Sequence, residues 1–454
     1  MLNDLMKRLA GTTGAITMLA TLGGVMITGC DSDGDGATDA ADTSEDTTVE
    51  DTTVEDTTVE DTTVEDTTPQ ETACDSDAIC ANVEGKARCD LGAGICVDAP
   101  RGYQIGSGDG TVSTVDITSL VQWTSPFEAT DLEFHPDRNE LWVVNRPFEV
   151  LGTCSQSNFN SARCRSLPGF VTVIFEPGTP NQKAEIHEDG NAWHFMRRPP
   201  TMAMASDGTW ATCGEAATGN FEDNSTQFIG PSLWSSDLSV FGPGPAGKNG
   251  SHLDMLHATP NCMGIAFEKD RVYWTFNGNV GAIDRYDFGE DHGPGNADHA
   301  DGQVFRYAEG NFSRVANVPS HMAFNAADNH LYVADTGNGR VAKMDTRSGV
   351  SGGLFAPVYE DLAAYGELDN VVVKDVVPAG TLTQPSGLAL HGDLLFVTDH
   401  ATSKIHVFEL DGTLVNTLDT GLPAGSLAGI EVGPDNKVYL SDMLTGEVYR
   451  VDPK

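Results

Sequence analysis

Six copies of one short strand–turn–strand pattern constrain the fold of this chain more than any other feature. In each copy an apolar segment leads into a polar turn, and a second apolar segment follows the turn and ends in a small or polar residue. The clearest copy runs from Pro319 to Asp335. Alternating apolar residues on both sides of such a turn are typical of β-hairpins. The other copies begin at Ala129, Pro199, Pro260, Pro385 and Leu427.

The hairpins recur every 40 to 70 residues, which leaves room for about four strands in each repeat. Repeats of this size predict a β-propeller, in which neighbouring blades cover each other and ring closure protects the sheet edges. We expect an all-β, six-bladed propeller over residues 106–454, with the segment Val112–Trp123 completing the last blade. A ring of five or seven blades would require a different division of the longest intervals.

The propeller geometry predicts which residues surround one mouth of the central channel. The first strand of each hairpin begins, and the second strand ends, at the same end of the ring. We therefore expect a small molecule or a protein ligand to bind at this mouth. Aspartates that end second strands, such as Asp335, could instead hold turns. The candidate ligand-binding residues are Asp131, Asn145, Arg146, Arg198, Asn277 and Asp335.

The segment Leu331-Tyr-Val-Ala-Asp-Thr-Gly-Asn-Gly-Arg-Val341 resembles the core motif of the NHL-repeat family, and the resemblance extends over the whole propeller region. It implies a six-bladed propeller. The family includes a peptidyl-hydroxyglycine amidating lyase, whose zinc is held by three histidines at the third position of first strands. Only His321 matches here, so that zinc site is not expected. The other ring positions are Asp131, Thr201, Cys262, Gly387 and Gly429.

A polar segment, Asp284–Asp301, contains two histidines and six acidic residues. We expect it to be an insertion that follows the second strand of the third blade. Carboxylates together with imidazoles can bind calcium or zinc, although such a loop can also be an ordinary soluble loop. Further histidines precede the second and third blades. The candidate metal ligands are His194, His257, His292, Asp298, His299 and His321.

Composition excludes several classes of function. The net charge of −41 argues against nucleic acid as a partner. The chain has no Cys-x-x-Cys-His, Gly-x-Ser-x-Gly or P-loop motif. Our first hypothesis is a monomeric, non-enzymatic propeller that binds a ligand at the channel mouth, with or without a metal. The second is a metal-dependent lyase or lactonase-type hydrolase that uses the same mouth.

Residues 1–29 have the features of an export signal, with Lys7 and Arg8 before an apolar run that is short for a membrane span. The run ends Ile27-Thr-Gly-Cys30, which resembles the lipobox of bacterial lipoproteins. This resemblance implies that Cys30 is lipidated and that the protein is anchored in the cell envelope, facing the periplasm or the exterior. The alternative is an ordinary signal peptide with a chance cysteine.

Residues 30–73 form a second distinct region, because 16 acidic residues and repeats of Glu-Asp-Thr-Thr-Val occur there without any lysine or arginine. Such a segment cannot bury a core and is expected to be an extended tether between anchor and propeller. Residues 74–97 resemble a truncated epidermal-growth-factor-like module. With so few residues, this module is expected to depend on disulfides.

Nine cysteines occur in the chain, and eight remain once Cys30 is assigned to lipid. An even number in an oxidising compartment predicts four disulfides. Neighbouring blades would bring Cys213 and Cys262 together, and Cys154 would pair locally with Cys164. The connectivity among the module cysteines stays open; they are Cys74, Cys80, Cys89 and Cys96.

Overall fold

The computed structural model describes most of the chain beyond the tether, and Thr68–Lys454 forms one compact unit. The expected signal, the lipidation residue Cys30, nearly all of the tether and the expected Cys154–Cys164 pair lie outside the described residues. No helix in the described part is long and apolar enough to cross a bilayer. The described ranges are 72–74, 77–80, 88–90, 94–123, 127–147, 168–217, 229–242, 250–296, 298–355 and 360–454.

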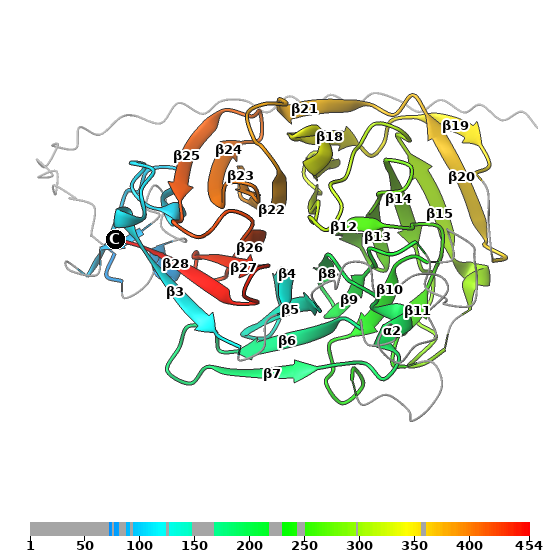
Figure 1. Cartoon of the computed structure of the whole chain (residues 1–454), viewed down its shortest axis with the longest axis horizontal. Helices are drawn as coiled ribbons and strands as arrows, with labels where there is room; N and C mark the ends of the chain where they lie inside the picture. The colour runs from blue at the N-terminus through cyan, green and yellow to red at the C-terminus, as the bar shows by residue number, and fades with distance from the viewer. Residues whose placement is uncertain are drawn as a thin grey trace, which may run out of the picture. The chain divides into compact units, whose positions relative to one another are not determined.

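Six sheets form the blades of a propeller, and the four blade strands in each are antiparallel (Figure 1). Blade 1 contains β4 (Glu128–Phe134), β5 (Glu140–Arg146), β6 (Phe170–Phe175) and β7 (Lys183–His187). Blade 2 contains β8 (Met202–Met204), β9 (Thr209–Thr212), β10 (Ser232–Ser235) and β11 (Asp254–Met255). Blade 3 contains β12 (Cys262–Lys269), β13 (Val272–Asn277), β14 (Ala282–Asp287) and β15 (Gln303–Tyr307).

The second half of the ring follows the same order. Blade 4 contains β16 (Met322–Asn325), β17 (His330–Asp335), β18 (Arg340–Asp345) and β21 (Val373–Val377). Blade 5 contains β22 (Pro385–His391), β23 (Leu394–Asp399), β24 (Lys404–Glu409) and β25 (Leu414–Asp419). Blade 6 contains β26 (Leu427–Val432), β27 (Val438–Asp442), β28 (Val448–Pro453) and β3 (Val115–Val121). Helical turns are short: α1 (Asp77–Cys80), α2 (Ala192–Phe195), η1 (Tyr103–Ile105), η2 (Val112–Thr114), η3 (His299–Asp301) and η4 (Thr336–Asn338).

The ring is closed by strands from both ends of the propeller. The innermost strands β4, β8, β12, β16, β22 and β26 each contact the next one, and β26 contacts β4. Strand β3 pairs antiparallel with β28, so the strand that precedes blade 1 completes blade 6. The predicted six-bladed fold is confirmed, including its closure by the first strand.

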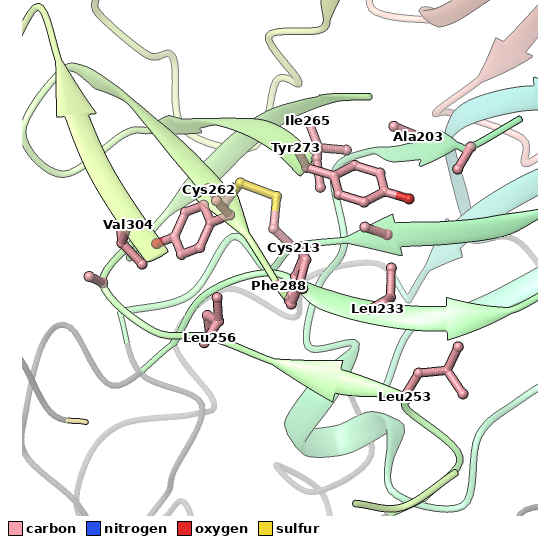
Figure 2. Packing of buried hydrophobic residues seen from close by; sticks show 14 of the residues in the cluster. Ala203, Cys213, Leu233, Leu253, Leu256, Cys262, Ile265, Tyr273, Phe288 and Val304 are labelled. Carbon is pink, nitrogen blue, oxygen red and sulfur yellow. A yellow bond between two sulfur atoms is a disulfide. The ribbon is translucent and has the colours of Figure 1, made fainter. Parts of the chain in front are cut away.

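The core is divided among the blade boundaries. Of the seven clusters of buried apolar residues in the described part, six each lie between two neighbouring blades, and the seventh contains Cys80, Cys89 and Cys96. Figure 2 shows the cluster between blades 2 and 3, which includes Cys213 and Cys262. Inner strands approach so closely that a Cβ atom at Gly264 or Gly387 would lie 2.0 Å from a carbonyl oxygen of the next blade. Only glycine fits at these two positions.

Two features of blade 3 differ from the prediction. Residues 284–287 are not loop but belong to β14, because Ile283, Asp284 and Tyr286 are buried between neighbouring strands. The insertion therefore follows the third strand of the blade. In addition, the hairpin β19 (Val350–Gly353) and β20 (Ala364–Asp369) departs from blade 4 and adds to blade 3, where β20 runs parallel to β15 (Figure 1).

The cysteine-rich segment contains α1, β1 (Arg88–Asp90) and β2 (Ile95–Val97), and β1 pairs antiparallel with β2. Its disulfides join Cys74 to Cys89 and Cys80 to Cys96, which resolves the connectivity that the sequence left open. Within the propeller Cys213 is bonded to Cys262 across blades 2 and 3, in the pairing that the blade geometry predicts.

Candidate metal centre

Two histidines and a glutamate from separate segments meet outside the channel; we call His257, His299 and Glu360 the histidine cluster. His257 Nδ1 contacts Glu360 Oε2, and His299 Nδ1 lies 2.8 Å from the same oxygen. The other oxygen, Oε1, accepts a 2.8 Å hydrogen bond from the backbone N–H of His257. One potential ligand atom from each residue lies within 4.8 Å of the other two. The spacing is compatible with one shared metal ion.

Each member of the histidine cluster comes from a different connection. His257 follows β11, the outermost strand of blade 2, and His299 begins η3 in the insertion between β14 and β15. Glu360 precedes β20, and the parallel pairing of β20 with β15 brings it to the cluster. The N–H of Ala363 donates to the carbonyl of Gly302 (2.9 Å), which fixes this segment against the insertion.

The histidine cluster favours the charged form of its carboxylate. Burial alone would raise the pKa of Glu360, but hydrogen bonds from His257 and His299 outweigh burial and lower the pKa to about 2. The hydrogen bond to Glu360 raises the pKa of His299, against the opposing effect of burial. Glu360 and His257 are buried, whereas the His299 side chain is 25% exposed. The cluster thus has one side open to solvent.

A second group of metal-type ligands, Asp254, His292 and Asp301, uses two of the three segments that form the histidine cluster; we call it the aspartate cluster. His292 Nε2 lies 3.3 Å from Asp301 Oδ1 and 3.9 Å from Asp254 Oδ2. Asp254 belongs to β11, whereas His292 and Asp301 belong to the insertion in blade 3. Burial raises the pKa of Asp254 to about 7 despite a hydrogen bond from the N–H of Met255 and the nearby His292.

The candidate metal ligands from the sequence do not form one site. His257 and His299 come together, and His292 lies in the aspartate cluster, but no metal-type group in the described residues includes His194, Asp298 or His321. Asp298 accepts a hydrogen bond from the N–H of Ala300 and caps η3. The His194 ring contacts Trp193 and Phe195. Sequence reasoning missed Asp254, Asp301 and Glu360.

The residues of the predicted ring do meet around the channel axis, where they contact one another. His321 Nδ1 from blade 4 lies 3.2 Å from Asp131 Oδ1 of blade 1. Asp131 Oδ2 also accepts hydrogen bonds from Thr201 Oγ1 (2.8 Å) and the N–H of Met202 (3.0 Å). Because blades 1 and 4 are opposite each other in a six-bladed ring, the Asp131–His321 pair crosses the axis.

An ion-pair network joins three blades at the predicted mouth. Arg146 is fully buried and donates to Glu128, to Glu215 Oε2 (2.8 Å) and to the carbonyl of Asn317 (2.6 Å). Glu215 follows β9 of blade 2, and Asn317 precedes β16 of blade 4. The mouth therefore contains the expected arginine, but its guanidinium already contacts protein groups.

Further arginines complete this network. Arg314 Nη1 lies 3.2 Å from Glu215 Oε1, and Arg198 Nη2 lies 3.7 Å from Glu215 Oε2. Arg198 also donates to the side-chain oxygen of Asn317 (2.8 Å). Three arginines contact Glu215, and Arg146 also contacts Glu128, so the guanidinium groups are already paired with two carboxylates. The network ties the blades together and does not by itself form an open binding pocket.

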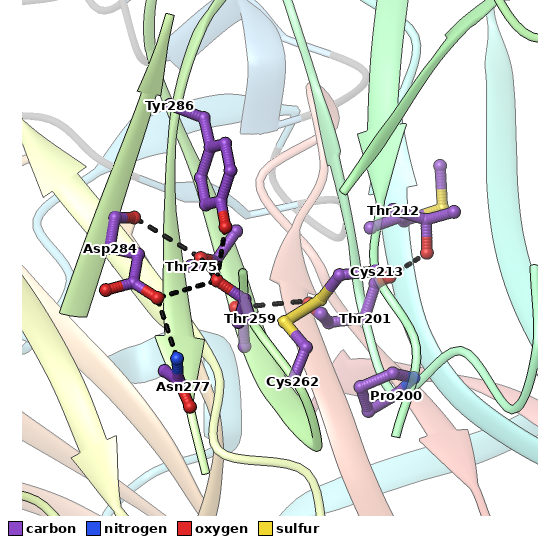
Figure 3. Close-up of a disulfide and its surroundings, with 12 residues drawn as sticks. Pro200, Thr201, Thr212, Cys213, Thr259, Cys262, Thr275, Asn277, Asp284 and Tyr286 are labelled. Atoms are coloured by element: carbon purple, nitrogen blue, oxygen red, sulfur yellow. Dashed lines mark hydrogen bonds between the residues drawn. A yellow bond between two sulfur atoms is a disulfide. The ribbon is translucent and has the colours of Figure 1, made fainter. Parts of the chain in front are cut away.

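The remaining candidate ligand-binding residues serve the blades themselves. Asn145 is buried and accepts a hydrogen bond from Thr172 Oγ1 (2.8 Å). Asn277 donates to Asp284 Oδ2 (2.8 Å), next to the Cys213–Cys262 disulfide (Figure 3). Asp335 is buried and accepts from the N–H of Ser313 (2.8 Å), which is the turn-holding role considered for these aspartates.

The opposite part of the channel contains a cavity of about 220 Å³ whose lining includes two glutamates, Glu133 and Glu431. Its other walls are mostly apolar and include Met204, Phe267 and Phe324. Burial raises the pKa of Glu431 to about 8, and the Asp131 carboxylate adds to this shift. Burial and the Glu431 charge raise the pKa of Glu133 in the same way. These shifts predict that the pair keeps a proton at neutral pH.

A pH dependence of stability follows from this pair. Between pH 4.5 and about 8 the folded chain holds a proton on Glu431 that the unfolded chain has released. The free energy of unfolding should therefore fall as the pH rises through this range. We expect Glu431→Gln to reduce the fall in melting temperature between pH 5 and pH 8, measured by circular dichroism. Glu185→Gln, on the exposed strand β7, should keep the wild-type slope; equal slopes in both variants would contradict this prediction.

Comparisons with known proteins show similarity in fold only. No family model matches the chain, and no curated protein matches it. A structural-genomics protein of unknown function from Bacteroides thetaiotaomicron is 12% identical, with a TM-score of 0.46, over 77% of this chain and 75% of that one. An auxiliary nutrient binding protein from Bacteroides ovatus is 11% identical, with a TM-score of 0.45, over 75% of this chain and 76% of that one.

An inactive variant of virginiamycin B lyase from Staphylococcus aureus, solved with quinupristin, is 9% identical with a TM-score of 0.40. The match covers 75% of this chain and 100% of that one. These similarities are too low to indicate a shared ligand or a shared activity.

Proposed function

We propose that this chain is a ligand-binding propeller of the bacterial cell envelope, anchored by lipid at Cys30, that binds Zn²⁺ through the histidine cluster. The observation that carries the proposal is that Nδ1 of His257 and Nδ1 of His299, from separate segments, approach one oxygen of Glu360. The location rests on the sequence Ile27-Thr-Gly-Cys30 and the acidic tether that follows it. The NHL-type repeat pattern is consistent with a propeller exported for ligand binding.

Two nitrogen donors and one carboxylate suit zinc, which binds imidazole and carboxylate and is usually four-coordinate. Three protein ligands leave a coordination position for solvent or for a ligand oxygen. We propose that this position faces the solvent-exposed side of His299. We therefore propose that the ligand carries an anionic or carbonyl oxygen. At the channel mouth Arg146 is already paired with Glu215. We therefore propose that the ligand binds at the histidine cluster and not at the mouth.

A metal-dependent hydrolase or lyase is the second candidate, and the three-ligand composition of the histidine cluster favours it. Catalytic zinc sites keep one position for water, and the ion lowers the pKa of that water to about 7. Hydrolysis of a panel of esters and lactones by the zinc-loaded chain, lost in Glu360→Gln, would favour this candidate. Zinc binding without turnover would favour the non-enzymatic one.

The zinc proposal is tested by replacing the shared carboxylate. We expect Glu360→Gln in the purified full-length chain to weaken Zn²⁺ binding at least about tenfold, because changes even outside the ligand shell cost about 10–100-fold. Equilibrium dialysis followed by elemental analysis measures the loss. Glu367→Gln, which removes a charge from β20 without touching the cluster, should bind like the wild type. Wild-type affinity in Glu360→Gln would overturn the proposal.

The lipid anchor is tested by cell fractionation. We expect the wild-type chain in the membrane fraction and Cys30→Ser in the soluble fraction.

A further inference from the structure

The carboxylate of Asp254 has an incomplete set of contacts. Its side chain is fully buried. Oδ1 accepts a 2.7 Å hydrogen bond from the N–H of Met255, but Oδ2 has no hydrogen-bond partner in the described part of the chain. A buried, charged oxygen without a partner is costly in free energy. Proteins usually compensate such an oxygen with a proton, an ion pair or a metal ion.

The groups that face Asp254 Oδ2 are themselves metal ligands. His292 Nε2 lies 3.9 Å away, which is beyond hydrogen-bond distance, and Asp301 Oδ1 lies 3.3 Å from the same nitrogen. One atom from each residue falls within 4.8 Å of the others. The second oxygen of Asp301 accepts a 2.7 Å hydrogen bond from the N–H of Glu290, which orients the carboxylate. The three residues are therefore close enough to bind one ion, and the unpartnered oxygen of Asp254 is available as one of the ligands.

We infer that the aspartate cluster binds a divalent cation of its own, distinct from the zinc proposed for the histidine cluster. Two carboxylates favour a harder ion than zinc, while the imidazole disfavours calcium and magnesium, which prefer oxygen. Mn²⁺ satisfies both conditions. The inference does not depend on the proposed function, since the residues of the two clusters differ and the incomplete contact of Asp254 belongs to this cluster alone.

The two clusters alternate along the same segments. Asp254 and His257 are three residues apart at the end of blade 2, and His299 and Asp301 are both in η3. An ion in the aspartate cluster would join β11 of blade 2 to the insertion of blade 3. It would thereby also fix the segment that carries His299. We expect Mn²⁺ to raise the melting temperature of the wild-type chain.

The test uses Mn²⁺ as the probe, because the electron paramagnetic resonance signal of free Mn²⁺ is lost when the ion is bound. We expect the wild-type chain to bind one Mn²⁺ tightly, and Asp254→Asn and His292→Gln each to weaken this binding at least tenfold. Asp298→Asn, an exposed position in the same insertion, should bind like the wild type. Glu360→Gln should also retain Mn²⁺, so a failure of the zinc proposal remains distinguishable from a failure of this one.

Stability gives a second readout that does not require binding. In the absence of metal, Asp254→Asn should melt at no lower temperature than the wild type, because a buried amide costs less to desolvate than a buried carboxylate oxygen without a hydrogen-bond partner. Added Mn²⁺ should reverse this order by stabilising only the wild type. The inference is overturned if Asp254→Asn and Asp298→Asn bind Mn²⁺ as the wild type does, or if both lose binding equally, since the latter indicates diffuse attraction to the acidic chain.

Discussion

Replacing Asp284 by alanine is expected to lower the free energy of unfolding of the propeller by about 3–5 kcal/mol, the usual cost of removing one partner of a buried ion pair. Asp284 is fully buried on β14 and accepts a hydrogen bond from Arg306 Nε (2.7 Å). It also accepts from Thr259 Oγ1 (2.7 Å) and Asn277 Nδ2 (2.8 Å), as Figure 3 shows. Arg306 is itself buried. The alanine variant would leave its positive charge without the carboxylate.

Urea unfolding followed by tryptophan fluorescence measures this effect. Asp287→Ala is the matched control, because it lies on the same strand and its carboxylate accepts only the N–H of Gly289 among the described contacts (3.1 Å). We expect that control to change stability by less than about 1 kcal/mol. The double change Asp284→Ala with Arg306→Met should recover part of the loss, since no uncompensated charge remains. A loss below 1 kcal/mol in Asp284→Ala would refute the argument.

Deleting residues 115–121 is expected to abolish the cooperative fold. This segment is β3, which pairs with β28 along its length and buries Val115 and Val121 at its two ends. Each buried valine contributes about 1.5–3 kcal/mol, and the lost ladder exposes the edge of β28. The total is comparable with the about 5–15 kcal/mol by which folded proteins are usually stable.

The deletion is compared with removal of seven residues from the tether, 50–56, which should leave the melting curve unchanged. Size-exclusion chromatography and thermal unfolding distinguish a folded propeller from an open or aggregated chain. Val115→Ala and Val121→Ala should be folded but less stable than the wild type. They test the contribution of β3 in chains that still fold. A cooperative transition at the wild-type temperature after deletion would show that closure by β3 is dispensable.

The propeller could be predicted from the sequence because its hairpins are local. Leu331–Ala334 is a run of apolar residues next to a turn, and the partner strand is only a few residues away. The strand β14 was harder to recognise, since Asp284 and Arg285 look like loop residues until the buried pair with Arg306 is known. Hydrophobic periodicity predicts that charged residues are exposed, and a buried charged residue in a strand therefore leads to a wrong prediction of a loop.

The candidate metal ligands could be predicted only in part, because their approach depends on contacts between segments far apart in the sequence. His257 and His299 are conspicuous in the sequence, but Glu360 joins them through a parallel pairing of β20 with β15 that no local pattern announces. His321 matched a family position, yet its neighbours across the channel are Asp131 and the carbonyl of Pro200, not further histidines. Asp254 lies between two histidines, His252 and His257, and this spacing was the one hint in the sequence that it could be a metal ligand.

The burial of His135, at the turn end of blade 1, could not be predicted from the sequence, because side chains there contact the neighbouring blade. His135 is buried and lies 3.0 Å from Ser236 Oγ of blade 2. Contacts between blades depend on the spacing of the ring and not on sequence distance. The same property explains why Arg146 and Glu215, which are conspicuous charged residues, neutralise each other at the mouth.

The hairpin β19–β20 has a consequence for how this protein can be rebuilt or can evolve. It belongs in sequence to blade 4 but is hydrogen-bonded to blade 3. Duplicating, exchanging or grafting blade 4 as a unit would therefore carry away the outer wall of its neighbour together with Glu360. Blades 3 and 4 therefore have to be exchanged together. An exchange of blade 4 alone would leave blade 3 without its two outer strands.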